Sequence, residues 1–290
     1  MGKKMDIAQL LGYKGKAVVV TGAFSGMGLA AARLLSALGA EVYAVCRRNG
    51  RHSELDFPVK KILYADFGIK EDVDRLAEEL PDDIFAMFLC HGIALKNDGS
   101  NTLEVQKVNF LGHKYLLEKS LHKVCDRGSV NIIASAGGFG WQDNFTNCMA
   151  VINAETYEDA LAWYENHPDE IASGYVFSKQ CLCTYVKAKA HSPEYIGRKI
   201  RLNVINPGNT ITGLTDDFNR GTSPTGNAEE GKAVIEALCL ECWDGYWAAP
   251  EDMGYPLVAI GSKMFSYMSG QVIYFDYGMS SVWELSEVED

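Results

Sequence analysis

Short, unbroken apolar runs alternate along this chain with segments whose apolar residues recur at helical spacing. The helical spacing is found at residues 27–39, 70–79, 101–122, 175–190, 228–242 and 250–262. The apolar runs have the length and β-branched content of buried strands: KAVVVTG, EVYAVC, KILYAD, IFAMFLCHG, SVNIIAS, RLNVINPG and GQVIYFD. Parallel sheets with helices on both faces contain such strands, so the alternation predicts an α/β fold with a doubly wound parallel sheet of the Rossmann type.

No linker or internal repeat interrupts the pattern, which predicts a single domain over residues 15–290. Residues 1–14 precede it as an N-terminal extension with a short amphipathic helix near residues 5–12. Residues 137–174 and 209–247 do not follow the alternation, and we expect both to be insertions that cover a binding site. Their aromatic side chains either pack locally or line a pocket. These aromatic residues are Trp141, Phe145, Tyr157, Trp163, Tyr164, Phe218, Trp243, Tyr246 and Trp247.

A glycine-rich turn joins the first strand to the first long helix. In VVVTGAFSGMGLAAARLL the glycines are Gly22, Gly26 and Gly28. Glycine allows close approach to the backbone, and a helix N-terminus offers unpaired N–H groups to an anion. The turn therefore predicts a cradle for the diphosphate of a dinucleotide, with a tight turn that binds no ligand as the alternative.

The charge balance narrows the classes of partner. The chain has 290 residues, 47% of them hydrophobic, and a formal net charge of −11. A negative protein is poorly suited to bind a phosphate backbone, so we expect no nucleic-acid partner. No apolar run reaches the length of a membrane span and the N-terminus does not resemble a signal peptide, so we expect no membrane association and a cytoplasmic location.

The chain contains eight cysteines, which we expect to be reduced. Cys181 with Cys183 and Cys239 with Cys242 could in principle supply four thiolates to zinc. Both pairs lie in helical, apolar segments where free cysteines are commonly buried, so we favour packing and expect no metal site.

Candidate chemistry lies near the ends of the predicted strands. Tyr175 and Lys179, in GYVFSKQCL, are four residues apart and share a helix face. A nearby ammonium favours the phenolate, so such a pair can transfer a proton near neutral pH, although the spacing also arises by chance. Ser135 follows a strand, and Asn109 lies within a helical segment where an amide favours a kink or a relay.

The ordered set T-G-x3-G-x-G, Asn, Ser, Y-x3-K and P-G-x3-T resembles the short-chain dehydrogenase/reductase superfamily over about residues 15–280. The long segment between Ser135 and Tyr175 and the L-C-x-G sequence after the fourth strand are similar to bacterial 3α-hydroxysteroid dehydrogenase/carbonyl reductases. The resemblance implies hydride transfer between a nicotinamide and a carbonyl or alcohol. It makes residues 15–290 a dinucleotide-binding catalytic domain.

The resemblance also implies roles for individual residues. Tyr175 would be the general acid/base, and Lys179 would lower the pKa of Tyr175 and hold the nicotinamide ribose. Ser135 would hydrogen-bond the substrate oxygen, and Asn109 would support a water relay to Lys179. Asp66 would meet the adenine and Thr212 the carboxamide. The full expected cofactor site is Gly22, Phe24, Ser25, Gly26, Met27, Gly28, Arg47, Arg48, Asp66, Phe67, Cys90, His91, Gly92, Tyr175, Lys179, Pro207, Gly208, Thr210 and Thr212.

Two positions bear on the cofactor. Where the family usually has Asn-Asn-Ala-Gly, this chain has Leu89-Cys90-His91-Gly92, and His91 is either part of the cofactor wall, which we favour, or a catalytic base. At the end of the second strand, Cys46 stands where NAD-preferring members have an acidic residue, and Arg47 and Arg48 follow it directly. Guanidinium groups suit a 2′-phosphate, so NADP(H) is the favoured cofactor and NAD(H) is the alternative. A second interpretation is that the two arginines are simply solvated and contact no cofactor.

The leading hypothesis is a hydroxysteroid dehydrogenase acting on a small apolar substrate, either a steroid or a bile acid. A carbonyl reductase for other apolar or aromatic ketones is the alternative. A non-catalytic nucleotide sensor on the same fold is disfavoured because a sensor need not keep Ser135, Tyr175 and Lys179 together. The family resemblance implies a homodimer or homotetramer.

Overall fold

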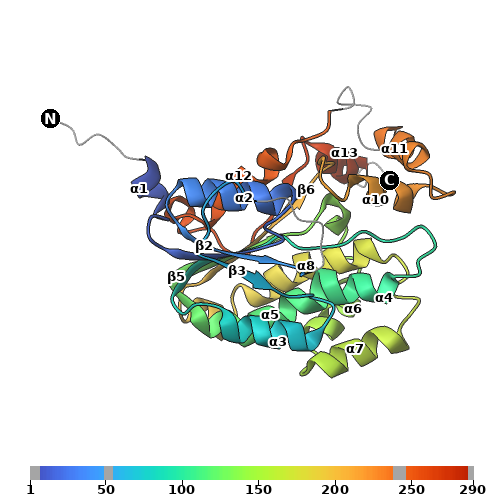
Figure 1. Ribbon diagram of the computed structural model, residues 1–290. Helices are drawn as coiled ribbons and strands as arrows, with labels where there is room; N and C mark the ends of the chain where they lie inside the picture. Colours follow the sequence, from blue (N-terminus) through green and yellow to red (C-terminus); the bar gives the residue numbers. More distant parts are fainter. Residues whose placement is uncertain (1–6, 49–54, 238–245, 287–290) are drawn as a thin grey trace.

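The predicted strands form one parallel sheet in the computed structural model, which describes residues 7–48, 55–237 and 246–286 (Figure 1). The strand order is β3-β2-β1-β4-β5-β6-β7. The strands are β1 Ala17–Thr21, β2 Glu41–Cys46, β3 Lys61–Tyr64, β4 Ile84–Leu89, β5 Val124–Ile133, β6 Arg201–Pro207 and β7 Val272–Phe275. The predicted doubly wound α/β fold is confirmed.

The strand order reverses at β1. This strand pairs with β2 on one side and with β4 on the other, so the connections that leave β1 and β4 run in opposite directions. A crevice forms at such a point beyond the carboxyl ends of the strands, and ligands bind there in open α/β sheets. The fold therefore places the glycine-rich turn after β1 beside the residues that follow β4.

Helices cover both faces of the sheet, and the alternation of side chains along β1 fixes which residues meet them (Figure 1). Val18 and Val20 pack in one apolar cluster with Leu35 and Leu257, and Val19 packs in the other. All five side chains are fully or almost fully buried, as expected for strands covered on both sides. The first face carries α2 Gly26–Ala37 and α12 Pro250–Gly261; the second carries α3 Lys70–Glu79, α4 Thr102–Gln106, α5 Gly112–Ser120 and α8 Tyr175–Lys189.

The helical segment predicted at residues 101–122 is not one continuous α-helix. A five-residue π-helix, η1 Lys107–Leu111, separates α4 from α5, and the 3-10 turn η2 Leu121–Lys123 follows α5. The buried Asn109 lies inside η1. Single π-turns within α-helices often occur at functional sites, and this one agrees with the kink expected at an amide within a helix.

Residues 137–174 form two helices, of which the first packs against α8 and the second packs against the first and against α4. They are α6 Phe145–Ile152 and α7 Tyr157–Asn166, and the short turn η3 Ala136–Gly138 precedes them. Thr156 begins α7 with a capping box in which its hydroxyl accepts from the backbone N–H of Asp159. Tyr157 and Tyr164 are buried in the same apolar cluster as α5 and α8. These aromatic residues therefore pack locally, which was one of the two expected outcomes.

Several short helices had no clear apolar period and were not predicted. They are α9 Pro193–Ile196, α10 Thr215–Thr222, η6 Lys263–Phe265 and α13 Met279–Ser286. The predicted N-terminal helix is found as α1 Ile7–Leu11, and α11 Ala228–Ile235 is the first part of the helix predicted at residues 228–242, whose last residues lie outside the described ranges. Among the described helices, none combines the length and the apolarity that crossing a membrane requires.

Candidate functional site

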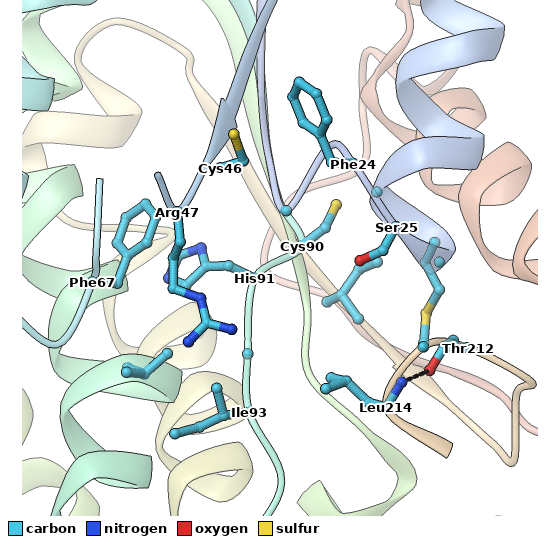
Figure 2. A pocket seen from close by; sticks show the side chains of 18 of the residues that line it. Phe24, Ser25, Cys46, Arg47, Phe67, Cys90, His91, Ile93, Thr212 and Leu214 are labelled. Carbon is cyan, nitrogen blue, oxygen red and sulfur yellow. Dashed lines mark hydrogen bonds between the residues drawn. The ribbon is translucent and has the colours of Figure 1, made fainter. Parts of the chain in front are cut away.

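A cavity of about 500 Å³ opens beyond the carboxyl ends of β1, β2 and β4 (Figure 2). The glycine-rich turn after β1 and the residues after β4 form two of its walls, and the N-terminal half of α8 and residues 212–218 extend it. The expected site residues that line it are Gly22, Phe24, Ser25, Gly26, Met27, Gly28, Arg47, Asp66, Phe67, Cys90, His91, Gly92, Tyr175, Lys179 and Thr212.

The glycine-rich turn has the geometry of an anion cradle. Gly22 and Gly26 have φ values of 66° and 50°, a region that side chains rarely allow. A Cβ atom on Gly28 would lie 2.3 Å from the carbonyl oxygen of Gly22, so only glycine fits there. Ser25 precedes α2 without a side-chain cap, which leaves N–H groups of the first helical turn facing the cavity. These residues fit the diphosphate of a dinucleotide.

The two arginines at the end of β2 take different positions. Arg47 lines the cavity, and Figure 2 shows its guanidinium directed into this space. The guanidinium carbon of Arg48 instead lies over the ring of Tyr64, 4.6 Å from its centre, and Arg48 does not line the cavity. Asp66 lines the cavity while its Oδ1 accepts a hydrogen bond of 2.9 Å from the backbone N–H of Gly68. Only Arg47 of the pair is placed to meet a phosphate.

His91 belongs to a stack of three rings at the cavity wall. Its ring centre lies 3.5 Å from that of Phe67 and 3.7 Å from that of His113, with nearly parallel planes. His91 Nδ1 lies 2.7 Å from the hydroxyl oxygen of Thr21, and that oxygen accepts from the backbone N–H of Cys90. This arrangement ties the end of β1 to the start of the loop after β4 and agrees with a place in the cofactor wall.

Burial keeps both histidines of the stack neutral. It lowers the pKa of His91 well below its usual value, and it lowers the pKa of His113 to about 3. The Nε2 atom of His91 and both ring nitrogens of His113 have no hydrogen-bond partner. A neutral His91 with such a low pKa is a poor general base, so the structure gives no support to the alternative catalytic role. The sequence pattern gave no signal for His113.

The two helical residues expected to transfer protons lie close together. The ammonium nitrogen of Lys179 is 5.3 Å from the centre of the Tyr175 ring, and both residues line the cavity. Ser135 hydrogen-bonds the phenol and lowers the pKa of Tyr175. Gly137, two residues after Ser135, approaches the same ring, since a Cβ atom there would lie 3.6 Å from Tyr175 Cε1. The structure thus brings Ser135, Tyr175 and Lys179 together.

The protonation of this group differs from the expectation. Burial raises the pKa of Tyr175 to about 12, and the hydrogen bond with Ser135 only partly opposes this. Lys179 is 3% exposed, and burial lowers the pKa of its ammonium to about 8. Its Nζ donates a long hydrogen bond of 3.5 Å to the carbonyl oxygen of Ile133. Burial is thus the largest influence on the pKa of both groups, and a lowering of the Tyr175 pKa by Lys179 stays a prediction.

Asn109 joins the catalytic helix to the loop after β4. Its Oδ1 accepts from the backbone N–H of Ile93 at 2.8 Å, and its Nδ2 donates to the carbonyl of Ile93 at 3.0 Å and to Ser178 Oγ at 3.3 Å. A Cβ atom on Gly92 would lie 3.3 Å from Asn109 Oδ1 and 3.6 Å from Lys179 Nζ. Asn109 is therefore close to Lys179, as a relay requires.

The segment after β6 is only partly in the cavity. Thr212 lines it, and its Oγ1 accepts from the backbone N–H of Leu214 at 3.2 Å (Figure 2). Pro207 ends β6, and Thr210 donates to the carbonyl of Gly208 at 3.0 Å. Pro207, Gly208 and Thr210 were expected in the site but do not line this cavity. Gly208 lines a second cavity of about 490 Å³.

Of the aromatic residues named in the two insertions, Phe218 alone among those described lines the cavity. Its ring lies 4.9 Å from that of Tyr175 at 78°. Trp247 donates instead to Glu236 at 3.3 Å, Tyr246 lines the second cavity, and Trp243 lies outside the described residues. The sequence reasoning did not name Ile93, Val108, Leu214 or Asp217, which also line the cavity. None of residues 137–174 does, so a lid role for that segment stays a prediction.

Two of the four cysteines named for a zinc site lie within the described residues, and each has its own neighbour. Cys181 lies with its sulfur 3.6 Å from that of Cys148, and Cys183 lies 3.4 Å from the Asn206 side chain. Cys239 and Cys242 lie outside the described residues. Within the described ranges, histidine, cysteine and acidic residues form no cluster of three that could hold a metal.

Comparison with known proteins agrees with this geometry. No protein-family model matches the chain. Coniferyl-alcohol dehydrogenase of Pseudomonas sp. (strain HR199 / DSM 7063) is 29% identical over 239 residues, which span 78% of this chain and 90% of that protein. The 3beta-hydroxysteroid dehydrogenase 1 of Eggerthella lenta is 27% identical over 273 residues, 92% of this chain and 94% of that protein.

A solved structure shares the fold. The 3-alpha-hydroxysteroid dehydrogenase from Pseudomonas sp. B-0831, complexed with NADH, superimposes with a TM-score of 0.71 over 93% of this chain and 99% of that chain. Its sequence identity is 20%, so this similarity concerns the fold. Two relatives are thus similar in sequence over most of this chain, and the solved structure shares its fold.

Proposed function

The chain belongs to the short-chain dehydrogenase/reductase superfamily, and we propose that it interconverts a secondary alcohol and a ketone on an apolar, ring-bearing substrate, with a steroid as first candidate. It is a nicotinamide-dependent enzyme that acts on CH–OH groups. The observation that carries the proposal is the placement of Tyr175 and Lys179 in the same cavity as the glycine cradle. The cofactor site and the proton donor are thereby joined in one space.

Tyr175 is the proposed general acid/base. In the reductive direction its hydroxyl donates a proton to the oxygen of the former carbonyl, while a bound nicotinamide supplies the hydride. The raised pKa of Tyr175, about 12, keeps this proton on the phenol until the oxygen becomes basic. Ser135, which hydrogen-bonds the phenol, is the proposed second donor to the same substrate oxygen.

Lys179 and Asn109 support the proton donor. The buried ammonium of Lys179 requires a polar partner, and the carbonyl oxygen of Ile133 at 3.5 Å satisfies it only weakly. The hydroxyls of a nicotinamide ribose would supply acceptors there. Asn109, held by Ile93, is the proposed anchor of a water relay that returns a proton toward Lys179.

NADP(H) is the proposed cofactor. Arg47 is the one basic side chain of the described residues that lines the cavity at the end of β2, where a ribose 2′-phosphate would lie. A guanidinium binds phosphate through charge-assisted hydrogen bonds. NAD(H) remains the alternative cofactor, since one exposed arginine does not exclude it.

The substrate proposal rests on similarity and on the apolar cavity wall. The relative from Eggerthella lenta, 27% identical, is a 3beta-hydroxysteroid dehydrogenase. The relative from Pseudomonas, 29% identical, is a coniferyl-alcohol dehydrogenase, and this favours a second candidate, the oxidation or reduction of aromatic alcohols and carbonyls. Phe218 beside Tyr175 suits either ring system.

A substrate screen with both cofactors tests the proposal. Hydroxysteroids, bile acids, coniferyl alcohol and a size series of ketones from acetone to keto-steroids would be followed by the absorbance of the reduced nicotinamide. We expect kcat/KM to rise by at least about 10³-fold from acetone to the preferred ring system, because apolar area buried in the transition state adds binding energy. Turnover of none of these, with the cofactor bound, would favour a nucleotide sensor. A homodimer or homotetramer stays a prediction.

A further inference from the structure

Helix α10 brings a carboxylate and an aromatic ring to the catalytic end of the cavity. Asp217 and Phe218 are adjacent in sequence, and both line the cavity together with Tyr175. The Phe218 ring lies 4.9 Å from the Tyr175 ring and at 78° to it, an edge-to-face contact. A substrate that reaches the phenol of Tyr175 therefore enters a cavity whose wall includes both side chains.

The charges that line the cavity are unevenly placed. The ionised side chains among the described lining residues are Arg47, Asp66, Lys179 and Asp217. Arg47 and Asp66 follow β2 and β3, on the side of β1 away from α8. Lys179 is buried beneath Tyr175, whereas Asp217 is exposed. The exposed charge that α10 contributes to the cavity is therefore negative.

The neighbouring charges of α10 do not offset this carboxylate inside the cavity. Arg220 and Asp216 are exposed on the same helix, and neither lines the cavity. No ion pair within the described residues involves Asp217. The carboxylate thus keeps its charge available to an incoming molecule.

We propose that Asp217 and Phe218 select neutral, flat substrates. The Phe218 ring holds a planar apolar group beside the reacting carbon, and the Asp217 carboxylate disfavours substrates with an anionic group close to that ring. This inference rests on the proposed oxidoreductase function and narrows its substrate class, so that neutral aryl or fused-ring ketones and alcohols precede their carboxylated analogues.

A pair of substrates that differ in charge alone tests the role of Asp217. 4-Acetylbenzamide and 4-acetylbenzoate have the same shape, and both can be assayed as substrates or as competitive inhibitors of a faster ketone. For the unmodified protein we expect kcat/KM, or the inverse inhibition constant, to favour the amide by about five-fold at low salt, because the charge is exposed and screened. Raising the salt concentration should shrink this preference.

Two matched variants separate Asp217 from the general charge of α10. Asp217→Asn should reduce the preference for the amide to less than about two-fold, because the repulsion is removed. Asp216→Asn removes an equal charge one residue away, outside the cavity, and should keep the original preference. An unchanged preference in Asp217→Asn, or an equal loss in both variants, would overturn the role of Asp217.

The role of Phe218 is tested with a flat and a puckered ring. Acetophenone and cyclohexyl methyl ketone have similar size, so Phe218→Leu should lower kcat/KM for acetophenone by about five-fold more than for the cyclohexyl compound. Phe265→Leu, on the distant turn η6, provides the control. An equal loss on both ketones in Phe218→Leu would overturn the selection of flat rings.

These outcomes distinguish a failure of the proposed selectivity from a failure of the proposed oxidoreductase function. Turnover of the ketones without the expected charge or shape preference overturns the selectivity of Asp217 and Phe218 and leaves the proposed oxidoreductase function intact. Absence of turnover with every ketone, despite cofactor binding, overturns the proposed function and the selectivity with it.

Discussion

The ammonium nitrogen of Lys179 lies 5.3 Å from the centre of the Tyr175 ring, and the two side chains share one face of α8. Burial acts on them in opposite directions, since it raises the pKa of the phenol to about 12 and lowers that of the ammonium to about 8. The neutral forms of both groups are therefore favoured more than in water. Their tasks in the reaction and their effects on stability can be measured separately.

Tyr175→Phe should lower kcat by at least about 10²-fold, because the proton donor is lost. The dissociation constant of the reduced cofactor should change by less than about three-fold, since the ring remains. Tyr185→Phe, which removes another buried hydroxyl of α8, is the matched control. Near-normal activity of Tyr175→Phe in steady-state kinetics would contradict the assignment.

Lys179→Met should raise the melting temperature by roughly 2–6 °C at neutral pH while abolishing turnover. The ammonium is 3% exposed and makes a single long hydrogen bond of 3.5 Å, so its burial costs stability. Calorimetry without cofactor measures the shift. A clear decrease in melting temperature would show that the ammonium stabilises the folded chain.

Gly28→Ala should weaken cofactor binding by at least about ten-fold. The added Cβ would lie 2.3 Å from the carbonyl oxygen of Gly22, so the turn that forms the cradle must shift. Gly213→Ala is the control, because it lines the same cavity with no atom within 4 Å of the added Cβ. Quenching of protein fluorescence by NADPH measures both, and equal binding by both variants would refute the cradle.

Arg47→Ala should weaken NADPH binding by about ten-fold or more and NADH binding by less than about three-fold, because only NADPH carries the 2′-phosphate. Arg48→Ala is the matched control, since Arg48 lies over Tyr64 and outside the cavity. Binding isotherms of each variant with NADPH and with NADH measure these effects. A larger effect of Arg48→Ala would place the phosphate on the other arginine.

Acid should destabilise the fold through His113. Burial lowers its pKa from 6.5 to about 3, so between these values the unfolded chain binds a proton that the folded chain does not. The free energy of unfolding should therefore fall as the pH decreases from about 6.5 toward about 3.

His113→Phe removes one of the two buried histidine titrations of the ring stack and should reduce the pH dependence in that window, while His91 keeps its own contribution; urea denaturation at several pH values measures the slope. His122→Phe, at an exposed position, is the control and should leave the slope unchanged. An undiminished slope in His113→Phe would assign the acid sensitivity to other groups.

The strands and the glycine turn could be predicted because each is encoded locally. Val18, Val19 and Val20 form a continuous apolar run, and the glycine-rich turn that ends with Gly28 follows them at the start of a helix. The ring stack could not be predicted, since His91 and His113 meet only through the register of η1. The contact of Phe218 with Tyr175 depends on α10, whose polar sequence gives no apolar period. Likewise, the aromatic residues of α7 gave no indication of which surface they cover.

The π-turn at residues 107–111 makes the number of residues here as important as their identity. A π-turn holds one residue more than the α-helical turn it replaces, and each residue of an α-helix advances the direction of the side chains by about 100°. Removing a single residue from this segment would therefore convert the π-turn into an ordinary α-helical turn and leave α4 and α5 in phase, but Asn109 would lose the position from which it reaches Ile93. Loops elsewhere in the chain can lengthen or shorten freely, whereas this helix fixes the spacing between the cofactor wall and the proton relay.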